Sequence, residues 1–247
     1  MKVSDKLNMD FEGLKKNGAI NIIALGDSVT HGAFALGEFD YKAVYHNILK
    51  EKINKERNYI PVNMINSGIG GDTAVGALER LERDVFSHNP DLVIVCFGLN
   101  DVNNSLGDYT YAMEKTLSLC RKNVEETILL TPNMLNTYVS DKTAPDFVDY
   151  SKITAEYQNS GRMDLFIDTA RAVAKKNDVP ICDCYKKWKE LYSRGYDTTA
   201  LLANKINHPN RSMHHLFASE LYRMIFKDIK SSFKTESTMY RKNRRGG

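Results

Sequence analysis

The sequence lacks the features that would place the chain in a membrane or in a disulfide-stabilised class. No uninterrupted apolar run approaches the ~20 residues that a membrane-spanning helix needs. Residues 1–20 hold no apolar segment followed by a cleavage site of small residues, so we expect no signal peptide. The four cysteines form no Cys-x-x-Cys pair, and a disulfide framework is not expected in a chain of 247 residues. These absences predict free thiols and a cytoplasmic protein.

An excess of positive charge is also missing, except at the C-terminal end. The formal net charge is +3, and residues 234–247 hold five basic residues against one glutamate. The rest of the chain is therefore close to neutral and offers no basic face for a nucleic acid. The basic end could touch nucleic acid or anionic lipid, but a solvated end is favoured. We expect an N-terminal lead-in at 1–19, one domain at 20–230 and a flexible basic tail at 231–247.

What the chain does contain is an alternation of strand-like and helix-like segments. This alternation predicts parallel strands joined by right-handed crossovers, and so an α/β fold with a three-layer α/β/α sandwich around a parallel sheet of about five strands. In such sheets, ligand sites form where loops leave the carboxyl ends of the strands. The expected strands are 20–25, 62–65, 92–97, 127–130 and 179–182, and the expected helices are 41–53, 76–86, 109–122, 161–176 and 213–229.

Residues 133–160 do not follow this scheme. They are rich in Tyr, Asp, Thr, Pro and Asn, and their apolar residues show only weak periodicity. A long irregular segment after a strand is often a substrate wall or a lid. An ordinary surface excursion with one short helix explains the same pattern equally well.

The first motif that indicates chemistry is Gly26-Asp27-Ser28, directly after the first expected strand. A serine at such a junction can direct its hydroxyl into the crevice above the sheet, and the preceding glycine permits a sharp turn. The motif differs from the Gly-x-Ser-x-Gly turn of the α/β-hydrolases, which disfavours that class. Taken alone, Gly-Asp-Ser is more often an ordinary turn.

A glycine-rich loop, Asn66 to Thr73, follows the second expected strand. Its three glycines let a backbone N–H approach a substrate oxygen closely, and Asp72 and Thr73 are suited to cap the next helix. A phosphate-binding loop would also be rich in glycine. However, no Gly-Lys-Ser/Thr follows and the pattern is not Gly-x-Gly-x-x-Gly, so a nucleotide site is disfavoured.

Two further motifs lie at comparable places in the chain. Asn100 follows the strongest strand, and its side-chain NH2 can point into the same crevice. With the N–H of Ser28 and a glycine N–H from the second loop, it would form an oxyanion hole with three donors. His208, held by a following proline just before the last helix, can reach back over the strand ends. Because no acidic ligand lies at helical spacing from the nearby histidines, we expect no metal site.

The four motifs in this order resemble the SGNH (GDSL-type) hydrolase superfamily over about residues 20 to 228. The resemblance implies a flavodoxin-like sandwich and a serine esterase that needs no cofactor. It also implies that Ser28 attacks an ester carbonyl and that His208 takes its proton. The oxyanion would be held by the N–H groups of Ser28 and Gly71 and by the side chain of Asn100.

One position departs from that family. Its members usually have an aspartate three residues before the histidine, which orients the imidazole, and here that position is Lys205. The orienting group is then a backbone carbonyl, Asn204 or a carboxylate from elsewhere. Asp27, Asn204 and Asn207 are candidates for support of the site. A second departure is Met213, where the family often has glycine.

The loops, rather than the motifs, decide which ester is hydrolysed. Tyr138, Asp146, Phe147 and Tyr150 suit sugar stacking and hydroxyl hydrogen bonds, which favours a carbohydrate O-acetyl esterase. A lysophospholipase or thioesterase acting on longer acyl chains is the alternative, but it would need an apolar groove and the site loops offer few leucines or isoleucines. A non-catalytic binding protein on the same scaffold is a third hypothesis, supported only by the missing aspartate. We expect a small-molecule or oligosaccharide ester as the partner, without nucleic acid or a membrane span.

Overall fold

The computed structural model describes residues 1–226, and its centre is a sheet of five strands. All neighbouring strands are parallel, and their order across the sheet is β2-β1-β3-β4-β5. The predicted parallel sheet of about five strands is therefore confirmed. The strands are β1 (Ile20–Gly26), β2 (Val62–Gly68), β3 (Leu92–Cys96), β4 (Glu126–Leu130) and β5 (Ile181–Cys182).

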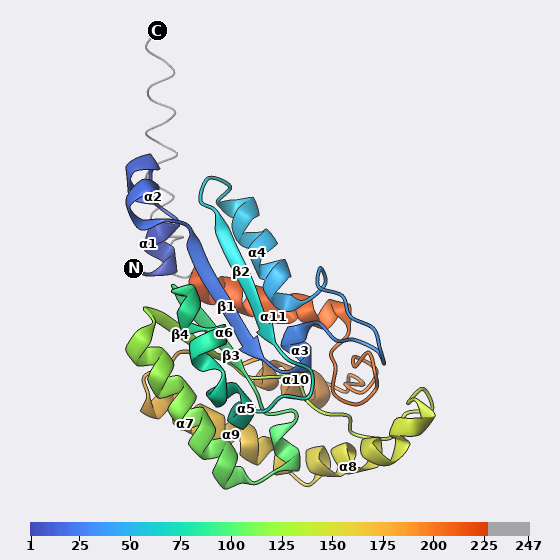
Figure 1. Ribbon diagram of the computed structural model, residues 1–247. Helices are drawn as coiled ribbons and strands as arrows, with labels where there is room; N and C mark the ends of the chain where they lie inside the picture. The colour runs from blue at the N-terminus through green and yellow to red at the C-terminus, as the bar shows by residue number, and fades with distance from the viewer. Residues whose placement is uncertain (227–247) are drawn as a thin grey trace.

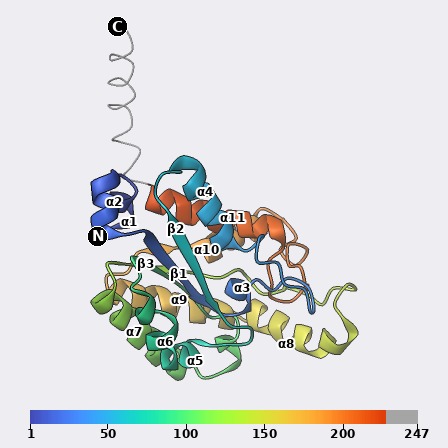
Figure 2. The same cartoon turned by 45° about the horizontal axis from the view of Figure 1, so that its top comes forward.

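Helices cover both faces of this sheet, which gives the three-layer sandwich expected from the sequence (Figures 1 and 2). One face carries α4, α10 and α11, and α4 packs along α11. The other face carries α5, α6, α7 and α9. These helices are α4 (Tyr45–Glu56), α5 (Ala74–Glu79), α6 (Leu81–Asp84), α7 (Leu106–Asn123), α9 (Arg162–Lys176), α10 (Cys184–Ser193) and α11 (Arg211–Ile225).

The central strand β3 forms where the sequence is most continuously apolar. All five of its side chains are buried, because the strand is covered by helices on both faces. Polar residues set the starts of the neighbouring helices. Thr73 accepts a hydrogen bond from the third N–H of α5, Ser105 caps α7 and Asn210 caps α11.

The strand order places a crevice beside β1. The chain leaves β1 for β2 on one side, and then crosses back to β3 on the other side. In doubly wound sheets, loops diverge at such a reversal and leave room for a ligand at the carboxyl ends of the strands. The loops after β1, β2 and β3 carry the first three sequence motifs, so the topology brings those motifs together.

Two of the differences between the predicted and the observed helices concern the surroundings of the crevice. The predicted helix at 76–86 is divided into α5 and α6 at Arg80, whose side chain turns inward to bind several oxygens described below. Within 133–160 the chain is irregular as far as residue 144. It then forms a 3-10 turn, η3 (Pro145–Phe147), and the twelve-residue helix α8 (Val148–Asn159). Figure 1 shows α8 extending beyond the carboxyl ends of the strands.

The remaining elements lie at the ends of the chain or inside loops. The predicted lead-in at 1–19 folds into two short helices, and the predicted tail at 231–247 lies outside the described residues. Among residues 1–226, no helix is long and apolar enough to cross a bilayer. All four cysteines are free and buried, as expected, and the cytoplasmic location stays a prediction. The remaining short elements at the N-terminal end and inside loops are α1 (Val3–Lys6), α2 (Phe11–Asn17), α3 (Ser28–His31), η1 (Phe86–His88) and η2 (Asp101–Asn103).

Candidate active site

A cavity of about 510 Å³ opens at the carboxyl ends of the strands. Its walls come from the loops after β1, β2 and β3, from the segment before α8 and from the loop before α11. Ser28, Gly71, Asn100 and His208, the four residues that the sequence singles out, all line it. Segments far apart in the chain therefore meet in one place.

Ser28 is held at the floor of this cavity by a short helix. It is the first residue of α3, directly after β1, and its side chain is largely buried. Asp27 begins the helix by accepting a hydrogen bond from the N–H of Val29 over 2.9 Å. Close packing sets the position of α3, because a Cβ at Gly68 would lie 2.2 Å from the backbone nitrogen of His31. Only glycine fits at that point of β2.

His208 lies within hydrogen-bonding distance of the serine. Its Nε2 is 2.9 Å from Oγ of Ser28, a distance at which the imidazole can accept the hydroxyl proton. The loop that carries it is folded back on itself, because Leu202 pairs with Pro209 and the carbonyl of His208 accepts from the N–H of Ala203. The structure thus pairs the two residues that the sequence predicts as nucleophile and base.

The other nitrogen of the imidazole contacts a backbone carbonyl. Nδ1 of His208 is 2.9 Å from the carbonyl oxygen of Phe34, which is the first of the orienting groups considered from the sequence. The hydrogen bonds of the Asn204 side chain go to other groups than the ring. Its Oδ1 accepts the backbone N–H groups of Ile206, Asn207 and His208, so it shapes the turn instead. The ammonium of Lys205 bonds to the carbonyl of Ala200.

This environment favours the neutral imidazole. Burial lowers the pKa of His208 below its ordinary value of 6.5, and the hydrogen bond with Phe34 acts in the opposite direction. A carbonyl at Nδ1 accepts a hydrogen bond, so that nitrogen carries the proton. Nε2 is then left as the acceptor that faces Ser28.

Two of the predicted oxyanion donors, Gly71 and Asn100, line the same cavity as the serine. Gly71 has φ of +81°, a backbone conformation that glycine adopts without strain and other residues rarely do. Asn100 donates one hydrogen bond from Nδ2 to the carbonyl of Asp72 over 2.9 Å. An amide nitrogen has two N–H groups, so the second is left for a ligand in the cavity.

Sequence reasoning missed Arg80, whose side chain holds the glycine-rich loop through Asp72. Its buried guanidinium donates to Oδ2 of Asp72, to the carbonyls of Ser67 and Gly26, and to Asp84. It therefore ties the end of β1 to the loop after β2. An arginine in a helix four residues before an aspartate has the pattern of an exposed ion pair, so the spacing alone gives no sign of this role.

A second missed residue is Asp101, which joins the loops after β2 and β3. Its carboxylate accepts the N–H groups of Ala74 and Gly98 over 2.8 and 2.9 Å. Burial raises the pKa of Asp101 to about 6 and that of Asp27 to about 7. Oδ2 of Asp27 is buried without a hydrogen-bond partner, so the region beneath the serine holds two carboxyl groups that are costly to ionise.

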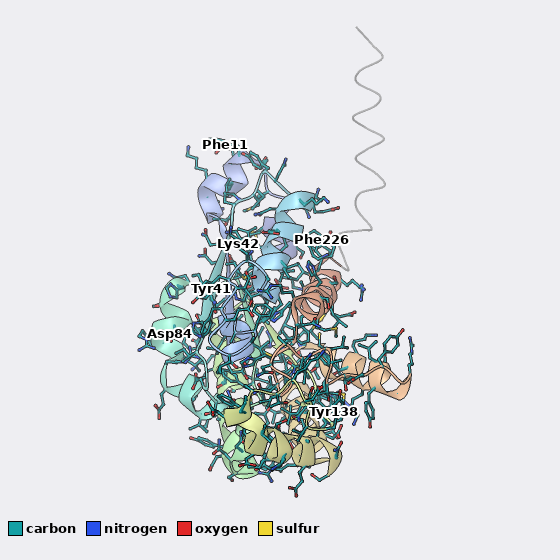
Figure 3. The ribbon with its side chains drawn as sticks, turned by 90° about the vertical axis from the view of Figure 1, so that its right-hand side faces the viewer. Phe11, Tyr41, Lys42, Asp84, Tyr138 and Phe226 are labelled. Carbon is teal, nitrogen blue, oxygen red and sulfur yellow. The ribbon has the colours of Figure 1, made fainter. Side chains whose placement is uncertain are left out.

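His31 contacts both the glycine-rich loop after β2 and two aromatic side chains, Phe39 and Tyr41. Its Nδ1 accepts the N–H of Gly70 over 3.2 Å, while its ring centroid lies 4.8 Å from that of Phe39 and 6.1 Å from that of Tyr41. Phe39 and Tyr41 are both exposed, and Phe39 also lines the cavity. Figure 3 labels Tyr41, which lies on the loop between α3 and α4.

The residues proposed from the sequence for sugar contacts are divided by the structure. Phe147 and Tyr150 line the cavity, so the segment before α8 and the start of that helix form one of its walls. Tyr138, labelled in Figure 3, donates a hydrogen bond to Asp197 over 2.7 Å and is not part of the lining. Asp146 is absent from the lining as well.

The apolar part of the cavity lining consists mainly of small and aromatic residues. It includes four alanines and two phenylalanines, and its aliphatic residues larger than alanine are Leu36 and Ile206, in agreement with the expectation of few leucines or isoleucines. Asn207 lines the cavity too, and its backbone carbonyl accepts a hydrogen bond from Asn133. No cluster of three His, Cys, Asp or Glu side chains that could hold a metal ion is found in residues 1–226.

Comparison with known proteins identifies the family of this chain. The model of the GDSL-like lipase/acylhydrolase family matches residues 24–216, which is most of the chain. The chain belongs to this family. It is therefore a carboxylic ester hydrolase, and the four motifs described above fall inside the matched region.

Curated relatives of this family member are distant. A lipoprotein of Bacillus subtilis, YqeF, is 25% identical over 217 residues, which cover 80% of this chain and 84% of the relative. An acetylxylan esterase of Geobacillus stearothermophilus is 25% identical over 179 residues, covering 64% of this chain and 80% of the relative.

Solved structures show the same fold. Axe2, an acetylxylan esterase from Geobacillus stearothermophilus, has a TM-score of 0.65 at 22% identity, and the match covers 83% of this chain and 94% of Axe2. A lipase/acylhydrolase from Enterococcus faecalis has a TM-score of 0.63 at 23% identity, covering 83% and 95%. At these identities the likeness concerns the fold.

Proposed function

We propose that this GDSL-family hydrolase is a serine esterase that removes short acyl groups, above all acetyl, from carbohydrate hydroxyls. Ser28 is the nucleophile and His208 the general base in this proposal. The observation that carries it is the 2.9 Å separation between Oγ of Ser28 and Nε2 of His208 at the floor of the cavity. A neutral imidazole at this distance can take the proton as the serine attacks.

The first half of the reaction follows from this arrangement. Oγ of Ser28 forms a bond to the ester carbonyl carbon while Nε2 of His208 receives the hydroxyl proton. The carbonyl oxygen becomes an oxyanion that accepts hydrogen bonds from the N–H groups of Ser28 and Gly71 and from Asn100. The bond to the sugar oxygen then breaks, and His208 returns its proton to that oxygen, leaving the acyl group on Ser28.

The second half regenerates the enzyme. A water molecule replaces the released alcohol, and Nε2 of His208 takes one of its protons as the water oxygen attacks the acyl carbon. The same three donors stabilise the second oxyanion. The bond to Ser28 breaks, its oxygen recovers the proton from His208, and the free acid leaves.

Two features support a small acyl group on a sugar. The cavity is lined by Phe39, Phe147 and Tyr150, and aromatic faces can stack on sugar rings while the Tyr150 hydroxyl offers a hydrogen bond. Two proteins similar to this chain, the curated Geobacillus relative and Axe2, are described as acetylxylan esterases. The distant identity leaves the sugar itself to experiment.

A second candidate is hydrolysis of longer acyl chains, as in a lysophospholipase or thioesterase. The aliphatic part of the cavity lining favours it, because Leu36, Ile206 and the neighbouring alanines could bury several methylene groups. Both candidates use the same serine and histidine, so the length of the acyl group distinguishes them.

The test compares p-nitrophenyl acetate with p-nitrophenyl octanoate, beside Ser28→Ala and His208→Ala. We expect acetate to be the better substrate by kcat/KM and both variants to lose turnover by at least about 10³-fold. Preference for octanoate would retain the mechanism and replace the proposed substrate. Turnover that persists in Ser28→Ala would contradict the mechanism itself.

The carbohydrate part needs its own substrate. Acetylated xylo-oligosaccharides should release acetate with the wild-type enzyme, and Phe147→Ala should raise KM for them more than for p-nitrophenyl acetate. A matched control is Phe11→Ala, because Phe11 is an exposed phenylalanine on α2, at the other end of the sheet (Figure 3). Equal effects of Phe147→Ala on both substrates would remove the argument from stacking.

A further inference from the structure

We propose that Arg211 is a positioning residue that holds the Phe34 carbonyl at Nδ1 of His208, in the role that an aspartate has in related hydrolases. The inference rests on the proposed roles of Ser28 and His208. It concerns a surface arginine that does not line the cavity and whose nearest partners are on another loop.

The imidazole of His208 needs a group that holds its orientation, and a backbone carbonyl is the group found there. Among residues 1–226, the hydrogen bond given to Nδ1 of His208 is the one with the Phe34 carbonyl, and no carboxylate is its partner. A neutral carbonyl attracts an imidazole less strongly than a carboxylate does. It also belongs to the backbone and cannot rotate to follow the ring, so the loop that carries it has to be held in place.

That loop is a short hairpin. Ala33 pairs with Phe39 in antiparallel fashion, the N–H of Phe34 donates to the carbonyl of Glu38, and the N–H of Asp40 donates to the carbonyl of Gly32. An isolated two-stranded hairpin is only marginally stable in water. Contacts from outside the hairpin are therefore needed to fix the Phe34 carbonyl.

Arg211 supplies three of these contacts. Its Nε donates to Asp40 over 3.0 Å, its Nη2 donates to Glu38 over 2.5 Å, and its guanidinium lies 4.7 Å from the centre of the Phe34 ring. The Phe34 ring is fully buried and also faces His214 at 4.8 Å. The arginine thus binds the second arm of the hairpin through Glu38 and Asp40, and on the first arm it contacts the residue whose carbonyl is used.

The position of Arg211 in the chain links both partners of the hydrogen bond. It is the first residue of α11 and follows His208 by three residues. One side of the Nδ1···O bond is therefore on the segment that Arg211 belongs to, and the other side is on the hairpin that Arg211 binds. A shift of the hairpin relative to α11 would change this bond directly.

The expected effect is on the rate rather than on folding. The Arg211 side chain is 51% exposed, and exposed ion pairs contribute little to folding stability. Misplacement of a catalytic group by about 1 Å can reduce the rate by about 10²-fold. For Arg211→Gln we expect kcat on p-nitrophenyl acetate to fall roughly tenfold, with KM within about twofold of wild type.

The experiment compares Arg211→Gln with four further variants of the full chain. Arg211→Lys should recover part of the rate, because it keeps the charge without the two-pronged contact. Glu38→Gln should act in the same direction as Arg211→Gln, and the double variant should be no slower than Arg211→Gln alone. The matched control is Arg223→Gln, which removes an exposed arginine paired with Glu220 near the other end of the same helix and should leave kcat unchanged.

A proton NMR signal separates positioning from general destabilisation. A proton on Nδ1 held by a carbonyl should give a downfield resonance that disappears in His208→Ala, and it should broaden or vanish in Arg211→Gln. An unchanged kcat and resonance in Arg211→Gln, or an equal loss in Arg223→Gln, would overturn the inference. If Ser28→Ala retains turnover, the proposed function fails instead, so the two failures are distinguishable.

Discussion

The side chain of Asn100 donates a hydrogen bond to the carbonyl of Asp72 over 2.9 Å, which joins the loop after β3 to the loop after β2. Asn100 and Ser28 line the same cavity. We expect Asn100→Ala to lower kcat/KM by about 10²–10³-fold, because it removes a proposed oxyanion donor. Ester hydrolysis by Asn123→Ala, which changes an exposed asparagine at the end of α7, is the control. A loss below threefold in Asn100→Ala would exclude a role in oxyanion binding.

The pH dependence of kcat/KM should reflect the buried histidine. Burial lowers the pKa of His208 below 6.5, and in the proposed mechanism its neutral form is the active base. Activity should therefore rise with pH and reach half its plateau at a pH below 6.5. Rates on p-nitrophenyl acetate between pH 4.5 and 8 test this. The pKa values of Asp27 and Asp101 are raised into a nearby range, so a control for these carboxyl groups is needed. If His208 sets the midpoint of the activity profile, Asp27→Asn should leave that midpoint unchanged. A midpoint above 6.5 would contradict the prediction.

Asp27 should make folding stability depend on pH. Its pKa is raised by burial from 3.8 to about 7, so the folded state binds this proton more tightly than the unfolded state. That contribution is fully present below pH 3.8 and is lost as the pH rises towards 7. The free energy of unfolding of Asp27→Asn, relative to wild type, should therefore increase between pH 5 and 7, by up to about 2 kcal/mol.

Urea unfolding at the two pH values measures this difference. Glu12→Gln is a suitable comparison, since Glu12 is exposed on α2. A difference between Asp27→Asn and wild type that stays constant from pH 5 to 7 would show that Asp27 does not change its protonation on unfolding in this range.

Gly68 should tolerate no side chain. A Cβ there would lie 2.2 Å from the nitrogen of His31 and 2.6 Å from the carbonyl carbon of Thr30, both backbone atoms of α3. We expect Gly68→Ala to destabilise the protein by about 2 kcal/mol or more, because the backbone has to move. Thermal unfolding measures the effect. Gly107→Ala, whose Cβ would meet only the Ser105 hydroxyl at 3.4 Å within α7, should be neutral or slightly stabilising.

Local patterns in the sequence predict the sheet and the parts of the site that follow its strands. The apolar run at 92–97 and the motifs at Ser28 and Asn100 report positions that a parallel sheet necessarily brings to one edge. The Phe34 carbonyl could not be predicted in this way. Every residue has a backbone carbonyl, so no sequence pattern marks this one. Its role depends on the fold of the hairpin and on contacts with Arg211, 177 positions further along the chain.

The buried position of the Arg80 side chain could not be predicted from the sequence for a related reason. Its partners at Gly26 and Ser67 are backbone oxygens at the ends of two strands, and only the assembled sheet places them together. The division of the predicted helix at 76–86 has the same origin. Periodicity describes one segment at a time, whereas these features are contacts between segments.

The separation of Ser28 from His208 has a consequence for how the protein is made. The two residues are 180 positions apart. A ribosome adds about 5–20 residues per second, so roughly 10 to 40 s pass between synthesis of Ser28 and synthesis of His208. If His208 is the base of Ser28, as proposed, the growing chain cannot hydrolyse esters by this mechanism during that interval. Under the proposed mechanism, the first turnover therefore marks a chain that has been translated past His208 and has brought that residue to Ser28.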